Sequence, residues 1–303
     1  MVKVTTFGQS DGEVLEEFSS YLASCWSGQF NHQYNISKSR VWKNWLKTSG
    51  NSEFWSCDNL QDAFEKYSWV SDTGTITPTN LKTSMQEALS KNDELAARTA
   101  CFDIFKWGGV SLSEKRNVSG NYVDKSRNWV ETMFSNGELC KQINLAVRLL
   151  QPECDEGLSD FSSSGLLMNS SMTKVYAFAD QEQNIAIYDS RVGAALGLIA
   201  RIFLEDESNE YDQIPRQLRF MWGESKSKVG TRDPSNALYK FPKLPYGSKA
   251  DRVKAELSRD TNILLQMALK KINQFAPAVD LEDIERSLFM IGYDVRQKSG
   301  GIM

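Results

Sequence analysis

The chain reads Ser-Ser-Met-Thr-Lys-Val-Tyr-Ala-Phe over residues 170–178 and Ile-Ala-Ile-Tyr-Asp-Ser-Arg-Val over residues 185–192. Lys174 stands near the start of a short apolar helix that follows a polar turn. Asp189 ends an apolar segment and precedes a second helical stretch, so its carboxylate is a candidate to accept the first free amides of that helix. The two residues are fifteen positions apart, and this arrangement predicts that both side chains face one cleft.

Helical periodicity continues on both sides of this region. Apolar residues at helical spacing predict helices over 11–26, 84–106, 126–151, 172–180, 190–204, 251–275 and 281–292. Gly108 and Gly109 end the second of these, and Asp280 is an N-cap candidate for the last. Strand alternation is weak, so the fold is predicted to be mostly α. The acidic and then Ser-rich segment 152–165 predicts a boundary between two lobes, 1–151 and 166–303.

Composition excludes several classes of function. Hydrophobic residues make up 41% and charged residues 24% of the 303, which is typical of a globular chain. No apolar run approaches the ~18–20 residues that span a bilayer, and the start lacks a signal peptide, so we expect a cytoplasmic protein without a membrane partner. His32 is the single histidine, which excludes two-histidine catalysis. The five cysteines form no CxxC pair, so we expect reduced thiols and no metal site.

The net charge of −4 conceals a local basic run. Residues 225–254 contain eight bases and only two acids, and among those bases are Lys226, Lys228 and Arg232. A local run of this kind can bind phosphates even on an acidic protein. It is equally consistent with an ordinary solvated face. Charge alone therefore leaves open whether the chain binds DNA.

The Thr-Lys-Val sequence, the apolar segment after it and the Asp189-Ser-Arg-Val sequence resemble the active-site region of the helix-hairpin-helix DNA glycosylases. The likeness is to the 8-oxoguanine DNA glycosylase branch and to bacterial proteins of that branch, some found among antiphage defence genes. It implies one two-lobed, glycosylase-like helical unit over residues 1–303, with no cofactor. It also implies that Lys174 is the amine nucleophile and that Asp189 stabilises the oxocarbenium-like transition state.

The resemblance also implies how DNA would bind. The partner would be double-stranded DNA, with phage DNA among the candidates, and the target base would be flipped out. The family's hairpin glycines fall at Ser170 and Met172, so the helix-hairpin-helix is a modified one. The remaining expected contacts are hydroxyls and a basic side chain at the DNA, and aromatic rings in the base pocket. Expected at the DNA are Ser170, Ser171, Thr173 and Arg191, together with Lys226, Lys228 and Arg232 of the basic run. Expected in the pocket are Trp222, Tyr188 and Tyr176.

The implied reaction is base excision that leaves an abasic site, with a lyase step if Lys174 forms a Schiff base. The excised base would be 8-oxoguanine or a hypermodified phage base such as glucosylated hydroxymethylcytosine. Two other interpretations stay open. Asp212, Glu224 and Lys226 resemble the core of a magnesium-dependent restriction-type nuclease. The chain also fits a non-catalytic helical module that binds DNA or a protein. Walker A and GxGxxG patterns are absent, so no nucleotide cofactor is expected.

Overall fold

The computed structural model describes residues 11–28, 30–36, 54–69, 76–110, 112–162, 165–206, 211–225, 231–247 and 250–296. These residues are mostly helical, as the sequence predicts. The α-helices are α1 (Asp11–Ser27), α3 (Leu60–Glu65), α4 (Pro78–Ser90), α5 (Glu94–Trp107), α6 (Lys125–Ser135), α7 (Leu139–Leu150), α8 (Met172–Ala179), α9 (Ser190–Glu205), α10 (Ala250–Ile272) and α11 (Leu281–Ile291), with a 3-10 turn η2 (Arg216–Leu218). The strands β1 (His32–Asn35) and β2 (Phe54–Cys57) pair antiparallel.

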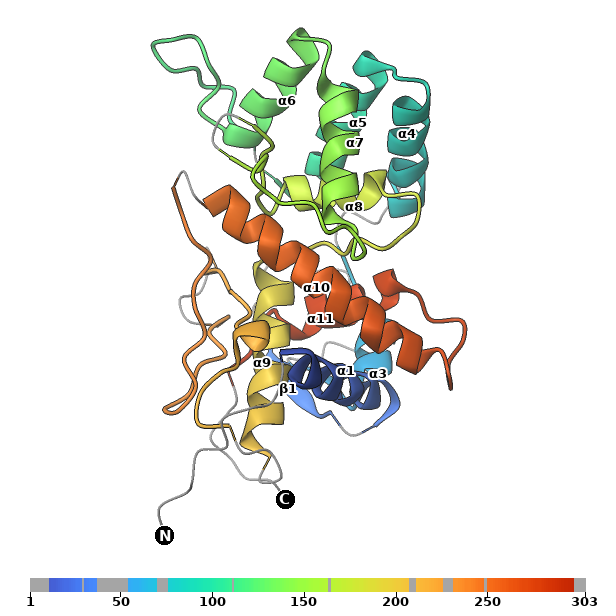
Figure 1. Ribbon diagram of the computed structural model, residues 1–303, viewed down its shortest axis with the longest axis vertical. Helices are drawn as coiled ribbons and strands as arrows, with labels where there is room; N and C mark the ends of the chain where they lie inside the picture. Colours follow the sequence, from blue (N-terminus) through green and yellow to red (C-terminus); the bar gives the residue numbers. More distant parts are fainter. Residues whose placement is uncertain are drawn as a thin grey trace.

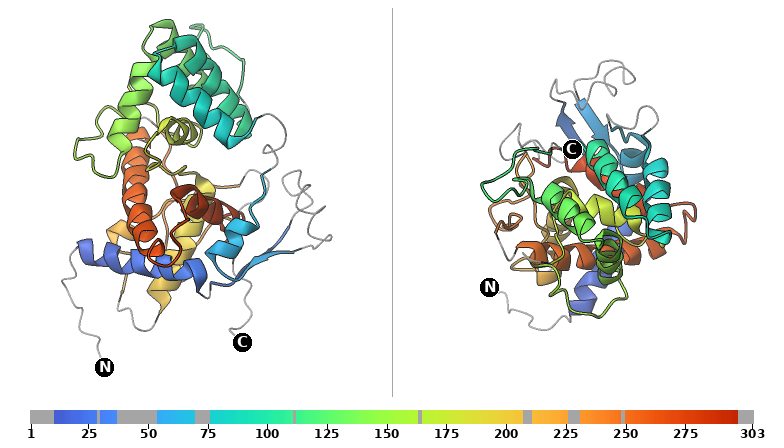
Figure 2. Two further views of the ribbon diagram at one scale, coloured as in Figure 1. Left: turned by 90° about the vertical axis from the view of Figure 1, so that its right-hand side faces the viewer. Right: turned by 90° about the horizontal axis from the view of Figure 1, so that it is seen from above.

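Two hydrophobic cores organise these elements. Helices α4 to α8 surround one core, and we call this part the α4–α8 lobe. Helices α1, α3, α9 and α11 surround the other with the two-stranded sheet, and we call this part the α9–α11 lobe. The long helix α10 runs between the lobes, as Figure 1 and the left view of Figure 2 show. Its Ala255 belongs to the first core and its Leu264 and Leu265 to the second.

The cores divide at a different place from the predicted boundary. Leu158 and Phe161, within the segment 152–165, are buried in the core of the α4–α8 lobe. Helix α1, at the start of the chain, packs on α10 in the other lobe. The chain instead starts in the core of the α9–α11 lobe, passes to the core of the α4–α8 lobe between α3 and α4, and returns at residues 185–188. The polar composition of 152–165 concealed its two buried side chains, and the contact between α1 and α10 joins segments that are far apart in sequence.

Most predicted helices are confirmed, and two need correction. The predicted helix 84–106 is two helices, α4 and α5, separated at Asn92, whose φ is +51°. The predicted helix 126–151 is likewise α6 and α7, separated at Gly137 with a φ of +67°. Asp280 caps α11 as predicted, with a reciprocal bond from Asp283. The five cysteines are all free thiols. Within the described ranges, no helix is both long and apolar enough to span a membrane.

The segment between α8 and α9 is extended, and side chains rather than a neighbouring strand hold its backbone. Four successive amides, at residues 185–188, each donate to a side-chain oxygen from a different part of the chain. The acceptors are Asp180 Oδ2 at 2.9 Å, Asn262 Oδ1 at 3.0 Å, Glu285 Oε2 at 2.7 Å and Thr173 Oγ1 at 2.8 Å, in chain order. Buried amides need such partners, so these four bonds fix where Asp189 emerges.

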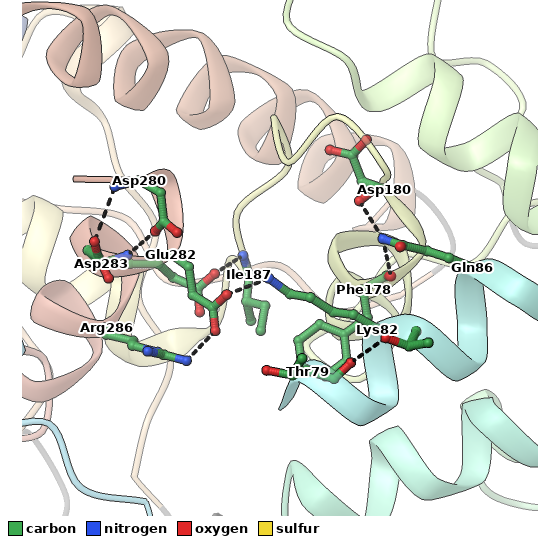
Figure 3. Close-up of polar contacts among 12 residues, drawn as sticks. Thr79, Lys82, Gln86, Phe178, Asp180, Ile187, Asp280, Glu282, Asp283 and Arg286 are labelled. Carbon is green, nitrogen blue, oxygen red and sulfur yellow. Dashed lines mark hydrogen bonds and ion pairs between the residues drawn. The ribbon is translucent and has the colours of Figure 1, made fainter. Parts of the chain in front are cut away.

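Polar contacts also tie the lobes together beside this segment (Figure 3). Lys82 of α4 forms an ion pair with Glu282 of α11, and Arg286 bonds to the same carboxylate from one turn further along α11. Gln86, one turn after Lys82, donates to the Asp180 carbonyl at 3.0 Å. Helix α4 is therefore anchored both to α11 and to the end of α8.

Candidate functional site

A cavity of about 180 Å³ lies at the junction of the two lobes. It collects side chains from both sides of that junction, including the end of α5, the start of α8, the start of α9 and the middle of α11. Its walls combine aromatic rings with ionisable groups. The aromatic members are Tyr67, Trp69, Trp107 and Phe289, and the ionisable members are Lys174, Asp189, Arg191, Arg232 and Glu285. Lys174 and Asp189, which the sequence predicts to face one cleft, thus line one cavity.

Lys174 projects from the first turn of α8 and is only 8% exposed. Its Nζ donates a hydrogen bond to the Ser170 carbonyl at 2.8 Å. Burial lowers the pKa of the Lys174 ammonium, against the opposing influence of the Asp189 and Glu285 carboxylates. The side chain passes so close to Gly108 that a Cβ there would lie 2.7 Å from Lys174 Cδ. Burial therefore makes the Lys174 ammonium easier to deprotonate than in water, and the close approach of Gly108 restricts the position of its side chain.

Asp189 is the N-cap of α9, as the sequence predicts. Its Oδ1 accepts hydrogen bonds from the amides of Arg191 at 2.7 Å and Val192 at 3.1 Å. Burial alone would raise the pKa of this carboxyl, but Lys174, Arg191 and Arg232 outweigh burial and hold the pKa below its usual value. Asp189 is therefore an ionised carboxylate in a partly enclosed site, where its negative charge acts more strongly than in water.

Glu285 is a second carboxyl group in the cavity, and the sequence analysis missed it. It lies on α11, and its Oε2 accepts the Ile187 amide hydrogen bond. Burial raises the pKa of Glu285 to about 8, assisted by Glu282 and Asp189 and opposed by the Ile187 bond and Lys174. At neutral pH this carboxyl therefore carries a proton. No local pattern marks it, because α11 reads as an ordinary amphipathic helix whose partner surface is set by tertiary packing.

The raised pKa of Glu285 predicts a pH-dependent stability. The folded chain keeps this proton up to about pH 8, whereas the unfolded chain releases it near the ordinary value of 4.5. The folded state binds more protons between these values, so the free energy of unfolding falls as pH rises through the window, by roughly 1 kcal/mol per pH unit. Glu285→Gln keeps an acceptor for Ile187 and has no proton to lose. Urea unfolding across this window should show a flatter pH dependence for the variant, and equal slopes would contradict the assignment.

Arg191 and Arg232 complete the charged part of the cavity. The Arg191 side chain lies inside an aromatic cage, with Cζ 4.2 Å from the ring centroid of Phe289, 5.1 Å from that of Tyr293 and 5.7 Å from that of Trp69. Cations are attracted to the faces of aromatic rings at such distances. Arg232 donates from one terminal nitrogen to the Ser190 hydroxyl.

Of the other residues predicted to contact DNA, some are exposed and some are buried. Ser170 is exposed, whereas Ser171 and Thr173 are buried in the α4–α8 lobe. The Thr173 hydroxyl already accepts the Tyr188 amide, so it serves the fold. The amides of Ser171 and Met172, at the start of α8, donate to Asn169 Oδ1. Lys226 and Lys228 lie outside the described residues.

The three aromatic residues predicted for the base pocket do not line this cavity. Trp222 is buried in the core of the α9–α11 lobe and donates to the Phe241 carbonyl at 3.2 Å. The Tyr188 hydroxyl turns away to Met221, and that of Tyr176 donates to Leu167 inside the other core. The correction has a physical cause: large aromatic side chains near a site are used first to fill cores.

The aromatic wall comes from other parts of the chain. Trp42, Trp45, Trp55 and Trp69 lie in the N-terminal part of the sequence, and their size favours packing on a core. Trp55 is indeed fully buried, whereas Trp69 lines the cavity and donates to the Trp107 carbonyl at 2.9 Å. Trp42 and Trp45 lie outside the described residues. His32, which packs beside β2, is buried with its Nε2 2.9 Å from the Asp294 carbonyl oxygen and takes no part in the cavity.

The nuclease-like residues are not assembled into a site within the described part of the chain. Asp212 and Glu224 are both exposed, and Glu224 forms an ion pair with Lys243 at 2.6 Å. Residues 211–225 contain the turn η2 and one isolated bridge, from Trp222 to Lys243, rather than the strands on which such a core is built. Among the described residues, no three His, Cys, Asp or Glu side chains converge as metal ligands do.

No protein-family model, curated protein or solved structure matches the chain. A fold does not by itself identify a function, because one fold can support many activities. The residues of the cavity, with their burial and charge, therefore carry the functional assignment.

Proposed function

We propose that the chain is a DNA glycosylase that flips a modified base into this cavity and cuts its N-glycosidic bond. One observation carries the proposal: Lys174 and Asp189 line the same cavity at the junction of the lobes. The first is a buried amine with a lowered pKa and the second an ionised carboxylate. An amine nucleophile and a carboxylate are the two groups that the family resemblance assigns to this reaction.

The proposed chemistry uses each charge in a defined way. As the bond between C1′ of the sugar and the base breaks, positive charge develops on the sugar, and the Asp189 carboxylate stabilises it. The Lys174 amine, in its unprotonated form, attacks C1′, and the proton that it loses as the new C–N bond forms passes to the carboxylate left on Glu285 after Glu285 has protonated the base. Glu285 carries a proton at neutral pH, and it donates this proton to the departing base. If the Lys174 bond to the sugar becomes a Schiff base, strand cleavage can follow.

The walls of the cavity suit a flipped base. Aromatic rings provide stacking surfaces that accept any base, and four of them line the cavity, as described above. A cavity of ~150 Å³ in another protein accepts benzene, so a volume of about 180 Å³ is of the size needed for the ring of a base. In this proposal a glucosyl substituent extends through the opening of the cavity, and the basic run that includes Arg232 contacts DNA phosphates.

The proposal is tested by incubating the purified chain with unmodified DNA, with 8-oxoguanine DNA and with T-even-type phage DNA. An aldehyde-reactive probe would count abasic sites, and borohydride would trap any Schiff base. We expect abasic sites on one of the modified DNAs and not on unmodified DNA. Magnesium-dependent nicking without abasic sites would favour the nuclease interpretation. Tight DNA binding without any product would favour the non-catalytic module.

Gly108 offers a test of how Lys174 is positioned. The backbone of Gly108 has a φ of −68°, which alanine adopts freely, so Gly108→Ala leaves the backbone unstrained. Its new Cβ would lie 2.7 Å and 2.9 Å from Lys174 Cδ and Cε, and the amine must shift. A displacement of about 1 Å can cost ~100-fold in rate, so we expect a loss of roughly tenfold to a hundredfold in base excision. Gly157→Ala, where a Cβ meets open space, is the matched control. Equal rates for both variants would contradict the positioning role.

A further inference from the structure

Two arginines of the cavity have side-chain N–H donors without acceptors among the described residues. Arg191 is 7% exposed, and its guanidinium makes no hydrogen bond or ion pair with a described residue. Among the described residues, Arg232 donates only to Ser190, and its Nε is buried with no acceptor from them. A guanidinium has five N–H donors, and leaving a buried donor unpaired is costly. Both side chains line the cavity, so a bound molecule could supply the missing acceptors.

The charged groups of the cavity also carry an excess of positive charge, which favours binding of an anion. Arg191 and Arg232 stay positive at neutral pH, although burial and the presence of Arg191 lower the pKa of Arg232 to about 10. Asp189 is negative. Burial shifts Lys174 and Glu285 towards their neutral forms. The two guanidiniums therefore face a single carboxylate, with which neither makes a direct ion pair. An enclosed net positive charge attracts anions strongly.

We infer that the cavity contains an anion subsite in which Arg191 and Arg232 together bind a phosphate or carboxylate group of the substrate. Arginine suits this role because its planar fork pairs with both oxygens of such a group. The aromatic cage of Phe289, Tyr293 and Trp69 holds the Arg191 fork in place without occupying its donors.

The substrate could supply the anion from two places. The inference rests on the proposed function only where it names these two places. The anion is either a phosphate of the nucleotide whose base is flipped, or an acidic substituent on that base. Both present the same chemistry to the arginines. Binding of the anion itself does not require glycosidic cleavage, so the subsite can be tested on the free protein.

The test is isothermal titration calorimetry of the full chain with small probes in matched pairs. Deoxycytidine 5′-monophosphate is compared with deoxycytidine, and 5-carboxycytosine with cytosine. We expect one anionic probe to bind at least about tenfold more tightly than its neutral counterpart, because a hydrogen-bonded charge contributes ~1.5–3 kcal/mol. An advantage for the monophosphate identifies the backbone as the source, and an advantage for the carboxylated base identifies the base.

The advantage should disappear in Arg191→Gln and in Arg232→Gln. Arg191→Lys keeps the charge without the fork, so it should retain only part of the advantage. Arg148→Gln is the control, because it removes a positive charge from an exposed ion pair with Glu156, away from the cavity. Circular dichroism would check that each variant is folded. No preference for either anion, or a preference that both glutamine variants retain, would overturn the subsite.

Asp189→Asn separates this inference from the proposed function. The substitution removes the negative charge that competes with a bound anion, so anion binding should become tighter by a few-fold or more. The same substitution should lower the rate of base excision by ~100–1000-fold if the proposed function is right. Anion binding that depends on the arginines, in a chain that excises no base from any DNA, would support the subsite and reject the glycosylase.

Discussion

Asp189→Asn is expected to lower the rate of base excision by ~100–1000-fold, the range found when one preorganised electrostatic group is removed from an active site. The asparagine keeps a side-chain oxygen that can accept the Arg191 and Val192 amides, so the cap of α9 should survive. The fold should therefore stay intact while the charge that stabilises the transition state is lost. Single-turnover counting of abasic sites on the responsive DNA measures the effect.

Lys174→Met is the partner variant, because methionine fills a similar volume without an amine. Borohydride trapping should vanish in this variant even if slow hydrolysis of the base persists. Lys91→Met, which removes an amine from an exposed ion pair with Glu87, provides the control. Full activity of Asp189→Asn, or trapping that survives in Lys174→Met, would show that the reaction takes place elsewhere in the chain.

Asp180→Ala is expected to be the most destabilising single change at the site, by about 3–5 kcal/mol, because it leaves two buried and two partly buried donors without an acceptor. The carboxylate is 1% exposed and ends α8. It accepts Gln151 Nε2 at 2.9 Å and the amides of Glu182, Asn184 and Ile185 at 3.1, 2.7 and 2.9 Å. One carboxylate thus organises the turn that leads from Lys174 to Asp189.

Urea unfolding followed by circular dichroism measures this cost. Asp155→Ala makes the same chemical change at an exposed position and should stay within about 0.5 kcal/mol of wild type. A loss below about 1 kcal/mol in Asp180→Ala would mean that water replaces the carboxylate at these donors.

The placement of Lys174 and Asp189 could be predicted because it depends on local structure. A helix begins just before Lys174, an apolar segment follows, and Asp189 caps the next helix. Local periodicity and capping preferences determine each of these features. The helices over 172–180 and 190–204 were predicted for the same reason, and their bounds agree with α8 and α9 within about one residue.

The remaining walls of the cavity could not be predicted from the sequence. Glu285 and Phe289 lie on α11, and Trp107 ends α5, so each reaches the cavity only through contacts between distant segments. Arg191 was predicted as a DNA contact, and its sequence gives no sign of the aromatic cage around it. Trp222 was chosen for its size, which suits a core as well as a pocket.

The side chains of residues 185–188 alternate between the two cores, and the sequence did not predict this. Ile185 and Ile187 belong to the core of the α4–α8 lobe, whereas Ala186 and Tyr188 belong to that of the α9–α11 lobe. An extended segment with one apolar face shows alternating polar residues, but a segment buried on both faces reads as an uninterrupted apolar run. The sequence of this segment therefore could not indicate that its side chains alternate between two cores.

This alternation makes the connection between α8 and α9 intolerant of changes in length. Successive side chains of an extended segment point to opposite sides. Inserting or deleting one residue would turn every following side chain of the segment to the opposite core. It would also shift each amide away from its side-chain acceptor and move Asp189 off the cavity. Natural variants of this chain should therefore differ in length at exposed loops such as 112–123, and keep the spacing from Lys174 to Asp189 constant.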